Sequence, residues 1–123
     1  MLLAAALQAA LAFNLACTGT EQAGPLGLSR PDQMPASFTI TYRIDMDLNR
    51  WCSGDCERTE EIGSVVFGHI LLRDQSAPSG RHVIDFDPAT GRLTDTLTDG
   101  DRQVLRRGTC TREPFTGLSA LHA

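Results

Sequence analysis

The sequence contains no lysine, and all eleven of its basic residues are arginine. This absence is typical of the compositional bias of a GC-rich genome, because lysine and arginine contribute the same charge to a protein surface. The formal net charge is −4, and no run of like charges is long enough to form a charged tail. Nucleic acids and anionic membrane surfaces bind to a basic field. The sequence therefore argues against both as partners.

The sequence also lacks the motifs that mark the common enzyme classes. It has no G-x-S-x-G nucleophile elbow, no glycine-rich phosphate loop and no dinucleotide-binding fingerprint. The paired C-x-x-C or H-x-x-x-H spacings that bind zinc are also missing. We therefore expect no cofactor and no bound metal, and the sequence favours a protein without enzymatic activity.

The first twelve residues, MLLAAALQAALA, are apolar and uncharged. They are too few to span a bilayer, which needs about 20 residues. The segment resembles the apolar part of a secretory signal, and Ala10 to Ala12 form the small-x-small pattern after which signal peptidase cuts. The usual basic n-region is missing, so a short buried N-terminal helix is the alternative. We expect a signal peptide at 1–12 and a single domain at 13–123, located in the periplasm or secreted.

A second interpretation of the N-terminus concerns Cys17. A small residue precedes it, as in a bacterial lipoprotein signal, but such a signal has an apolar residue where this chain has Asn14. The apolar residues Phe13, Leu15 and Cys17 instead alternate with more polar neighbours, which is a strand pattern. We therefore expect the first strand at 13–18 and no lipid anchor at Cys17.

The clearest pattern in the chain lies between Phe38 and Leu48. Six apolar side chains alternate there with polar ones: Phe38, Ile40, Tyr42, Ile44, Met46 and Leu48. This alternation predicts a long antiparallel strand with one buried and one solvated face. A helix is excluded, since at about 100° per residue these side chains would be spread around its axis.

The remainder of the chain predicts further strands and turns. Residues 21–35 contain three prolines and two glycines, which predicts a long loop. The apolar segment 62–73 is either one strand with a bulge at Gly68 or a tight pair that turns there. Shorter strands are expected at 82–86, 92–98 and 102–110. About five to seven strands and no helix predict an all-β fold, a small antiparallel meander that forms a barrel or a two-layer sandwich.

Four cysteines in an exported chain of this size indicate two disulfides. Sequence alone leaves the pairing open, but Gly54 lets the chain between Cys52 and Cys56 turn back sharply enough to join them. The remaining pair would join Cys17 to Cys110 and tie the first strand to the last. In the chain-entropy model the long loop contributes roughly 4–5 kcal/mol and the short loop about 2 kcal/mol.

The segment WCSGDC allows two other interpretations, a redox couple or part of a zinc site. A redox pair usually has two residues between its cysteines and a helix that follows. Cys52 and Cys56 have three residues between them, and no helical pattern follows. Zinc would need further close-set ligands, which only the isolated Cys110, His69 or His82 could supply. A structural disulfide is therefore favoured.

His69 and His82 are the candidates for acid–base or metal-binding chemistry, together with nearby carboxylates. Strand alternation places His82 on the apolar face of its strand, and Asp85 and Asp87 on the opposite face. A histidine at the edge of the core and two solvated carboxylates are favoured over a catalytic group. The enzyme hypothesis would require these side chains to converge in one pocket.

Three residues are candidates for binding a partner. Trp51 precedes the cysteine turn, where it either anchors the disulfide, which we favour, or binds a partner if it is partly exposed. Arg106 and Arg107 belong to a small basic cluster that could hold an anionic partner. Acidic residues are interleaved with this cluster, so local ion pairing is favoured.

The segments YRIDMDLNRWCSGDC, DPATGRL and GTCTREPFTG together resemble a type of small exported bacterial protein without an assigned activity. The resemblance covers most of the chain after Phe13. It rests on turn glycines, cysteines and strand residues, so it implies no catalytic or binding residue. At the level of the fold, the chain is also similar to the small periplasmic β-barrel inhibitors of lysozyme, with no inhibitory motif to transfer.

These patterns predict an exported, disulfide-bonded all-β domain without enzymatic activity. We expect a binding or inhibitor-type module of the cell envelope whose partner is an envelope protein or a small ligand. One alternative is a small hydrolase or metal-binding protein that uses His69, His82 and nearby carboxylates. The other is a purely structural component of the envelope.

Overall fold

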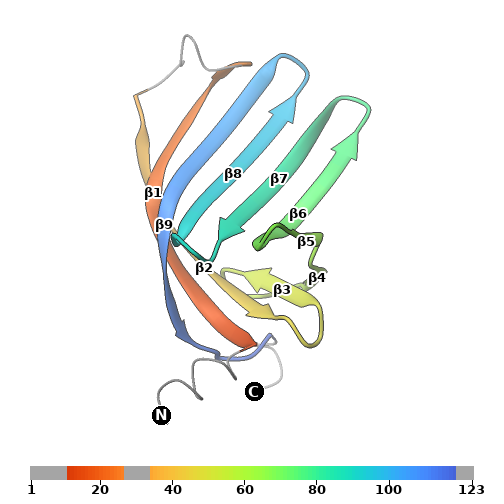
Figure 1. Cartoon of the computed structure of the whole chain (residues 1–123). Coiled ribbons are helices and arrows are strands. Elements are labelled where there is room, and N and C mark those ends of the chain that lie inside the picture. The colour runs from red at the N-terminus through yellow and green to blue at the C-terminus, as the bar shows by residue number, and fades with distance from the viewer. Residues whose placement is uncertain (1–10, 27–33, 119–123) are drawn as a thin grey trace.

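The computed structural model of the chain describes residues 11–26 and 34–118. In this part of the chain, nine strands form a single antiparallel sheet and there is no helix (Figure 1). The strands are β1 (Ala12–Pro25), β2 (Ala36–Asp45), β3 (Arg50–Ser53), β4 (Glu60–Glu61), β5 (Ser64–Val66), β6 (His69–Ala77), β7 (Gly80–Asp87), β8 (Arg92–Asp99) and β9 (Arg102–Pro114). The expected all-β fold is confirmed, with more strands than the sequence predicted.

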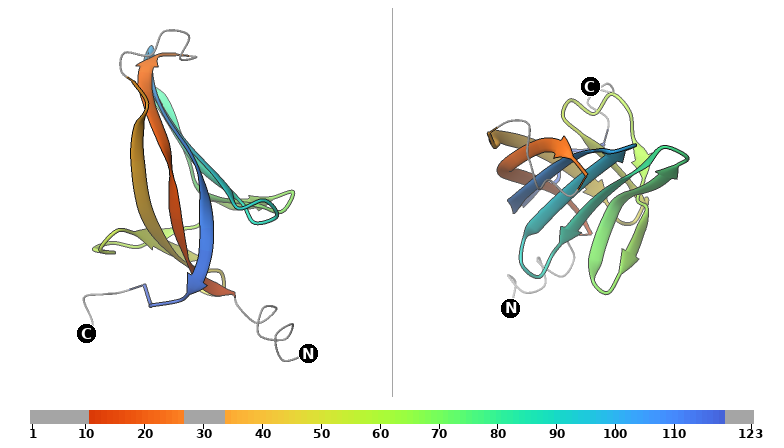
Figure 2. Two further views of the ribbon diagram at one scale, coloured as in Figure 1. Left: turned by 90° about the vertical axis from the view of Figure 1, so that its left-hand side faces the viewer. Right: turned by 90° about the horizontal axis from the view of Figure 1, so that it is seen from above.

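The order of the strands across the sheet is β4-β3-β2-β1-β9-β8-β7-β6-β5. The first and last strands of the chain therefore lie side by side in the middle, and the two edge strands are consecutive in the sequence. The sheet curls into a half-barrel, as the views from the side and from above show (Figure 2). The expected meander is thus one curled sheet and not a two-layer sandwich.

The inner face of the curled sheet holds the hydrophobic core. Strand alternation places every second side chain on this face, and cross-strand pairs such as Phe13 with Ile44 and Phe86 with Leu93 bring apolar partners together. The buried core residues are Phe13, Leu15, Cys17, Tyr42, Ile44, Trp51, Ile62, Ile70, Leu72, Ile84, Phe86 and Leu93. The core joins the two halves of the sheet, since its members come from β1–β3 and from β6–β8.

A short linker closes the half-barrel at the end where the core lies. Only Ile62 and Gly63 join β4 to β5. The Ile62 amide donates to the Asn49 carbonyl at 3.1 Å, and the Gly63 amide donates to the carbonyls of Leu71 and Leu72 at 2.9 and 3.2 Å. These bonds hold the two edges of the sheet next to each other.

A β-bulge in β6 lies beside this linker. The register of β6 against β7 shifts between Leu71 and Arg73, so that Leu72 is the extra residue. Leu72 is fully buried in the core, and Arg73 takes the position opposite Ile84, another inward-facing residue. The bulge therefore turns the Arg73 side chain toward the inner face.

Both disulfides favoured by the cysteine spacing are present. Cys17 and Cys110 are direct cross-strand partners of β1 and β9, with Cα atoms 4.0 Å apart. Cys52 and Cys56 close the turn after β3, and Gly54 between them has a positive φ of 63°. Because the sulfur of Cys17 is bonded to Cys110, it cannot at the same time carry a lipid anchor.

The prediction of a loop at 21–35 is wrong for residues 21–25, which belong to β1. β1 continues to Pro25, because Glu21 and the residues after it still pair with β9. The register between β1 and β2 ends at Glu21, so the last residues of β1 lie at an edge of the sheet. Such an edge tolerates glycine and proline, which the sequence pattern took for loop residues.

Two turns explain the other differences from the expected strands. β2 ends at Asp45 and does not reach Leu48, because Asn49 takes a positive φ of 57° and turns the chain. The segment 62–73 contains a tight turn, with positive φ values of 50° at Phe67 and 81° at Gly68. Of the two arrangements expected there, the paired strands are the one observed.

Residues 1–10 of the expected signal peptide lie outside the described residues. Ala12, the last residue of that expected segment, is already the first residue of β1. Within residues 11–26 and 34–118, no helix is long and apolar enough to cross a membrane.

Candidate functional site

A series of charged and polar side chains continues the inner face beyond the hydrophobic core. Its members are Glu21 of β1, Arg106 of β9, Asp95 of β8, His82 of β7, Arg73 of β6 and Glu60 of β4. The strand register brings them together, because it sets Arg106 opposite both Glu21 and Asp95. We call this set the inner polar chain.

Arg106 lies at one end of the inner polar chain. Its Nε donates to Oε1 of Glu21 at 2.5 Å, and its Nη1 lies 3.9 Å from Oδ2 of Asp95. The guanidinium group also lies 5.5 Å from the centroid of the Phe38 ring. The hydrogen bond to Glu21, with the charges of Glu21 and Asp95, raises the pKa of Arg106. Arg106 therefore remains a permanent cation on the inner face.

His82 connects the two halves of the inner polar chain. Its Nε2 lies 2.7 Å from Oδ1 of Asp95, and its Nδ1 lies 3.0 Å from Nη1 of Arg73. A guanidinium group can only donate, so Nδ1 must accept from Arg73 and the ring proton must be on Nε2, which donates to Asp95. This arrangement assigns a neutral His82 with both ring nitrogens engaged. Asp95 itself is almost fully buried.

Arg73 ends the inner polar chain at the closed end of the half-barrel. Its guanidinium group donates to both carboxylate oxygens of Glu60 and lies 5.3 Å from the centroid of the Trp51 ring. The indole Nε1 of Trp51 donates to the Glu61 carbonyl at 3.2 Å. Arg73 thus links β6 to β3 and β4 across the gap between the edge strands.

The Tyr42 hydroxyl is the one buried side-chain polar atom without a hydrogen-bond partner among the described residues. Tyr42 is 1% exposed, and its ring packs against Trp51 with centroids 5.9 Å apart. Burial raises the pKa of Tyr42 strongly, and the negative charge of Asp95 acts in the same direction, while Arg106 and Arg73 oppose it. The hydroxyl therefore lies within the electrostatic reach of the inner polar chain.

A cavity of about 140 Å³ lies beside these groups. It is lined by His82, Asp95, Leu97, Val104 and Arg106. A larger groove of about 500 Å³ shares His82 and Leu97 with the cavity and extends over the ends of β6, β7 and β8. The inner face thus combines a small, partly charged cavity with a wider opening toward solvent.

His69 lies on the opposite face of the sheet from His82. Its Nδ1 lies 2.8 Å from Oδ1 of Asp85, and its Nε2 lies 3.6 Å from Oδ2 of Asp87. The hydrogen bond to Asp85 raises the pKa of His69, and the charges of Asp85 and Asp87 add to this effect. The enzyme hypothesis requires the two histidines and their carboxylates to converge in one pocket. In the structure they lie on opposite faces of the sheet. No cluster of potential metal ligands occurs in the described part of the chain.

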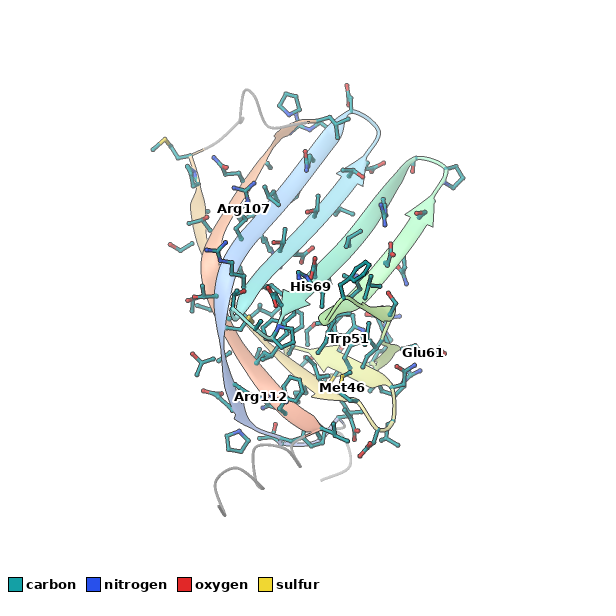
Figure 3. All side chains as sticks on the ribbon, in the orientation of Figure 1. Met46, Trp51, Glu61, His69, Arg107 and Arg112 are labelled. Atoms are coloured by element: carbon teal, nitrogen blue, oxygen red, sulfur yellow. A yellow bond between two sulfur atoms is a disulfide. The ribbon has the colours of Figure 1, made fainter. Side chains whose placement is uncertain are left out.

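The three candidate binding residues are placed differently by the fold. Trp51 is 2% exposed and lies between β3 and the β5–β6 hairpin, so its side chain is part of the core (Figure 3). Arg106 lies on the inner face at the cavity, as described above. Arg107 is exposed on the other face of β9, because adjacent residues of a strand point to opposite sides (Figure 3). The expected basic cluster therefore does not form one surface.

Several residues of the inner polar chain were not predicted from the sequence, although the alternation around one of them indicated that it faces inward. Asp95 lies midway between Leu93 and Leu97, so strand alternation places a carboxylate on the apolar face of β8. Glu21 was assigned to a loop, and Tyr42 was counted only as an apolar residue. The inward position of Arg73 could not be predicted from the sequence pattern, because only the bulge in β6 brings this side chain to the inner face.

Fold and site together define a disulfide-bonded, all-β half-barrel with a polar cavity on its inner face. No protein-family model matches the chain, and neither a curated protein nor a solved structure matches it significantly. The resemblances to small exported bacterial proteins and to lysozyme inhibitors gain no support from these comparisons. The function is therefore argued from the site alone.

Proposed function

We propose that the protein is an exported, non-enzymatic binding module that holds a small ligand on the inner face of its half-barrel. The observation that carries this proposal is the cavity of about 140 Å³ on the inner face, where the charged Asp95 and Arg106 lie beside the apolar Leu97 and Val104. A concave site with apolar walls and a few charged groups is typical of the sites that bind small ligands.

The arrangement of the histidines favours binding over catalysis. A general base needs a free ring nitrogen within reach of the proton that it removes. Both nitrogens of His82 are engaged by Arg73 and Asp95, and His69 lies on the other face with its own carboxylate partners. Both cysteine pairs are oxidised, so no thiol can act as a nucleophile.

Export is supported by the cysteines and by the N-terminal sequence. Disulfides persist in oxidising compartments and are rare in the bacterial cytoplasm. The signal-like segment MLLAAALQAALA precedes the first disulfide-bonded strand. We therefore place the binding function in the cell envelope or outside the cell.

A fragment screen by NMR tests the binding function. The full chain, labelled with ¹⁵N, is titrated with a library of small polar fragments. We expect the hits to shift the amide resonances of Asp95, Leu97 and Val104, which line the cavity. Hits that instead cluster around Phe67 or His69 would move the binding surface to the outer face, and a screen without hits would favour a purely structural component.

The mass of the protein purified from its native host tests export. We expect a chain shortened by cleavage after Ala12, and four alkylated thiols that appear only after reduction. An intact N-terminus with freely alkylated thiols would contradict export.

A further inference from the structure

We propose that the free edge of β2 pairs with the same edge of a second copy of this chain, so that the sheets of the two copies join into one. The free edge is the segment Ala36–Ile40, at one border of the half-barrel (Figure 2). This dimer does not depend on the ligand proposed above. Three features support it: the direction of the backbone groups, the lack of charge, and the pairs that a two-fold axis would form.

The backbone of the free edge presents hydrogen-bonding groups to solvent. β3 pairs with β2 only from Tyr42 to Asp45, and the Gly54 amide donates to the Thr41 carbonyl at 3.1 Å. The Thr41 carbonyl therefore points away from β1. Every second residue of a strand directs its backbone groups to the same side, so those of Ser37 and Thr39 also point away from β1. Among the described residues, no backbone group pairs with them on that side.

The free edge lacks the features that normally keep an exposed edge strand from pairing. Such edges are protected by charges, by proline or by being very short. The part of β6 beyond β5 contains Asp74 and is followed by Pro78, while β4 and β5 have two and three residues. The segment ASFTITY, residues 36–42, has no charge and no proline, and is rich in residues that favour strands. Two copies can therefore meet here without like charges opposing each other, although each has a net charge of −4.

A two-fold axis at Phe38 would use the whole free edge. β2 begins at Ala36, and the backbone of Thr41 is already bonded to Gly54, so Phe38 is the middle of the segment between them. Antiparallel pairing about Phe38 sets Ser37 opposite Thr39 of the second copy, and Thr39 opposite its Ser37. Both pairs then exchange backbone hydrogen bonds in each direction.

The side chains in this register match on both faces of the joined sheet. On the inner face, Phe38 meets Phe38 of the second copy, and Ala36 meets its Ile40. Phe38 and Ile40 are only partly buried in the single chain, so the pairing removes apolar surface from water. On the outer face, the exposed hydroxyls of Ser37 and Thr39 lie side by side. Aromatic pairs and pairs of Ser and Thr are among the cross-strand contacts that stabilise antiparallel sheets.

The pairing covers one short strand segment on each copy, which is less area than a stable interface buries. We therefore expect a weak, reversible dimer with a Kd on the order of 100 µM. A two-fold axis perpendicular to a sheet leaves its faces in place, so the inner faces of both copies would open toward the same side. The dimer would thus present two equivalent inner faces next to each other.

Sedimentation velocity of the protein purified from its native host, between about 10 µM and 1 mM, tests for the dimer. Thr39→Pro removes an outward N–H group and leaves the pairing of β2 with β1 in place, so it should weaken dimerisation about tenfold. Ser76→Pro is the matched control on the edge of β6 and should leave dimerisation unchanged. Its cross-strand partner Arg81 directs its backbone amide to Thr98 of β8, so the Ser76 amide points away from β7. Urea denaturation checks that both variants are folded.

Two double variants test the register. Ser37→Asp with Thr39→Asp sets carboxylates opposite each other across the axis and should abolish the dimer. Ser37→Asp with Thr39→Arg sets opposite charges there and should restore it. Both side chains are exposed in the single chain, so neither double variant disturbs the core.

A protein that remains monomeric over this range of concentration would overturn the proposal, and the free edge would be left to an extended segment of another protein. A dimer that persists in Thr39→Pro and in the variant with two aspartates would place the contact elsewhere on the molecule, which also contradicts the proposal. Loss of the dimer in Thr39→Pro but not in Ser76→Pro, with recovery when opposite charges are introduced, would support pairing through β2.

Discussion

His82 and Asp95 are joined diagonally across β7 and β8 by a hydrogen bond of 2.7 Å from Nε2 to Oδ1. His82 is paired directly with Leu97, and Asp95 with Ile84, so the bond runs between two cross-strand pairs that each join one polar and one apolar residue. A polar bond in this position stabilises the fold only while both partners are present, because either one alone would be left unsatisfied on the inner face.

Replacement of Asp95 is expected to destabilise the protein. Asp95→Leu leaves Nε2 of His82 without an acceptor and removes a carboxylate near Arg106, which should lower the free energy of unfolding by about 1–3 kcal/mol. Urea denaturation measures the change. Thr94→Leu, on the exposed face of the same strand, is the control and should change it by less than about 0.5 kcal/mol. Equal stability of both variants would show that the bond contributes nothing.

Tyr42→Phe is expected to stabilise the free protein. The ring and its contact with Trp51 remain, while the unpartnered hydroxyl is removed from the core. The free energy of unfolding should rise by about 1 kcal/mol, as measured by urea denaturation without ligand. A loss of stability would mean that the hydroxyl has a partner in solution, for example a bound water.

Phe67→Asn is expected to stabilise the β5–β6 hairpin. Phe67 is 99% exposed and has a φ of 50°, a conformation that asparagine adopts more readily than an aromatic residue. The free energy of unfolding should rise by about 0.5–1 kcal/mol. Leu48→Asn is the matched control, because Leu48 is also exposed but has no positive φ. If the two variants behave alike, the turn conformation is not the cause.

The two disulfides should differ in their contribution to stability. Removal of the Cys17–Cys110 bridge, which closes a loop with a sequence separation of 93, should cost roughly 4–5 kcal/mol in the chain-entropy model. Removal of Cys52–Cys56, with a separation of 4, should cost about 2 kcal/mol. Double alanine variants of each pair, compared by thermal and urea unfolding, give the ranking. A reversed order would contradict the loop-entropy argument.

His69 should make the protein more stable at mildly acidic than at alkaline pH. Its pKa is raised in the folded state by Asp85, so its contribution is fully present below its unfolded pKa of about 6.5 and is lost as the pH rises through the folded value. NMR titration of His69 should show the upward shift. Asp85→Asn should abolish most of it, and an unchanged titration in this variant would contradict the assigned cause.

The sequence predicted the fold class well because two-residue alternation is a local signal, and because the close pair Cys52–Cys56 leaves the other two cysteines to each other. The alternation from Phe38 onward predicted a strand, and Cys17 and Cys110 were expected to link the first and last strands. Strand ends were predicted less well. The alternation runs on to Leu48 in the sequence, but the positive φ of Asn49 turns the chain before that.

The candidate site could be predicted only in part. His82 was placed correctly on the face that it shares with Ile84, and Asp95 could have been placed by the same alternation. The pairing of Glu21 with Arg106 depends on a register between strands far apart in the sequence. The inward turn of Arg73 depends on a bulge that no local pattern indicated.

The two-residue linker between β4 and β5 gives the molecule a direction of access. Glu61 and Ser64 are separated by three peptide steps of about 3.8 Å each, so the two edges cannot move far apart at this end. The groove lies away from this closed end, and its lining includes Ser79 in the turn between β6 and β7. A bulky label at Ser79 should therefore hinder binding in the groove, whereas the same label at the exposed Leu48 should leave binding unchanged.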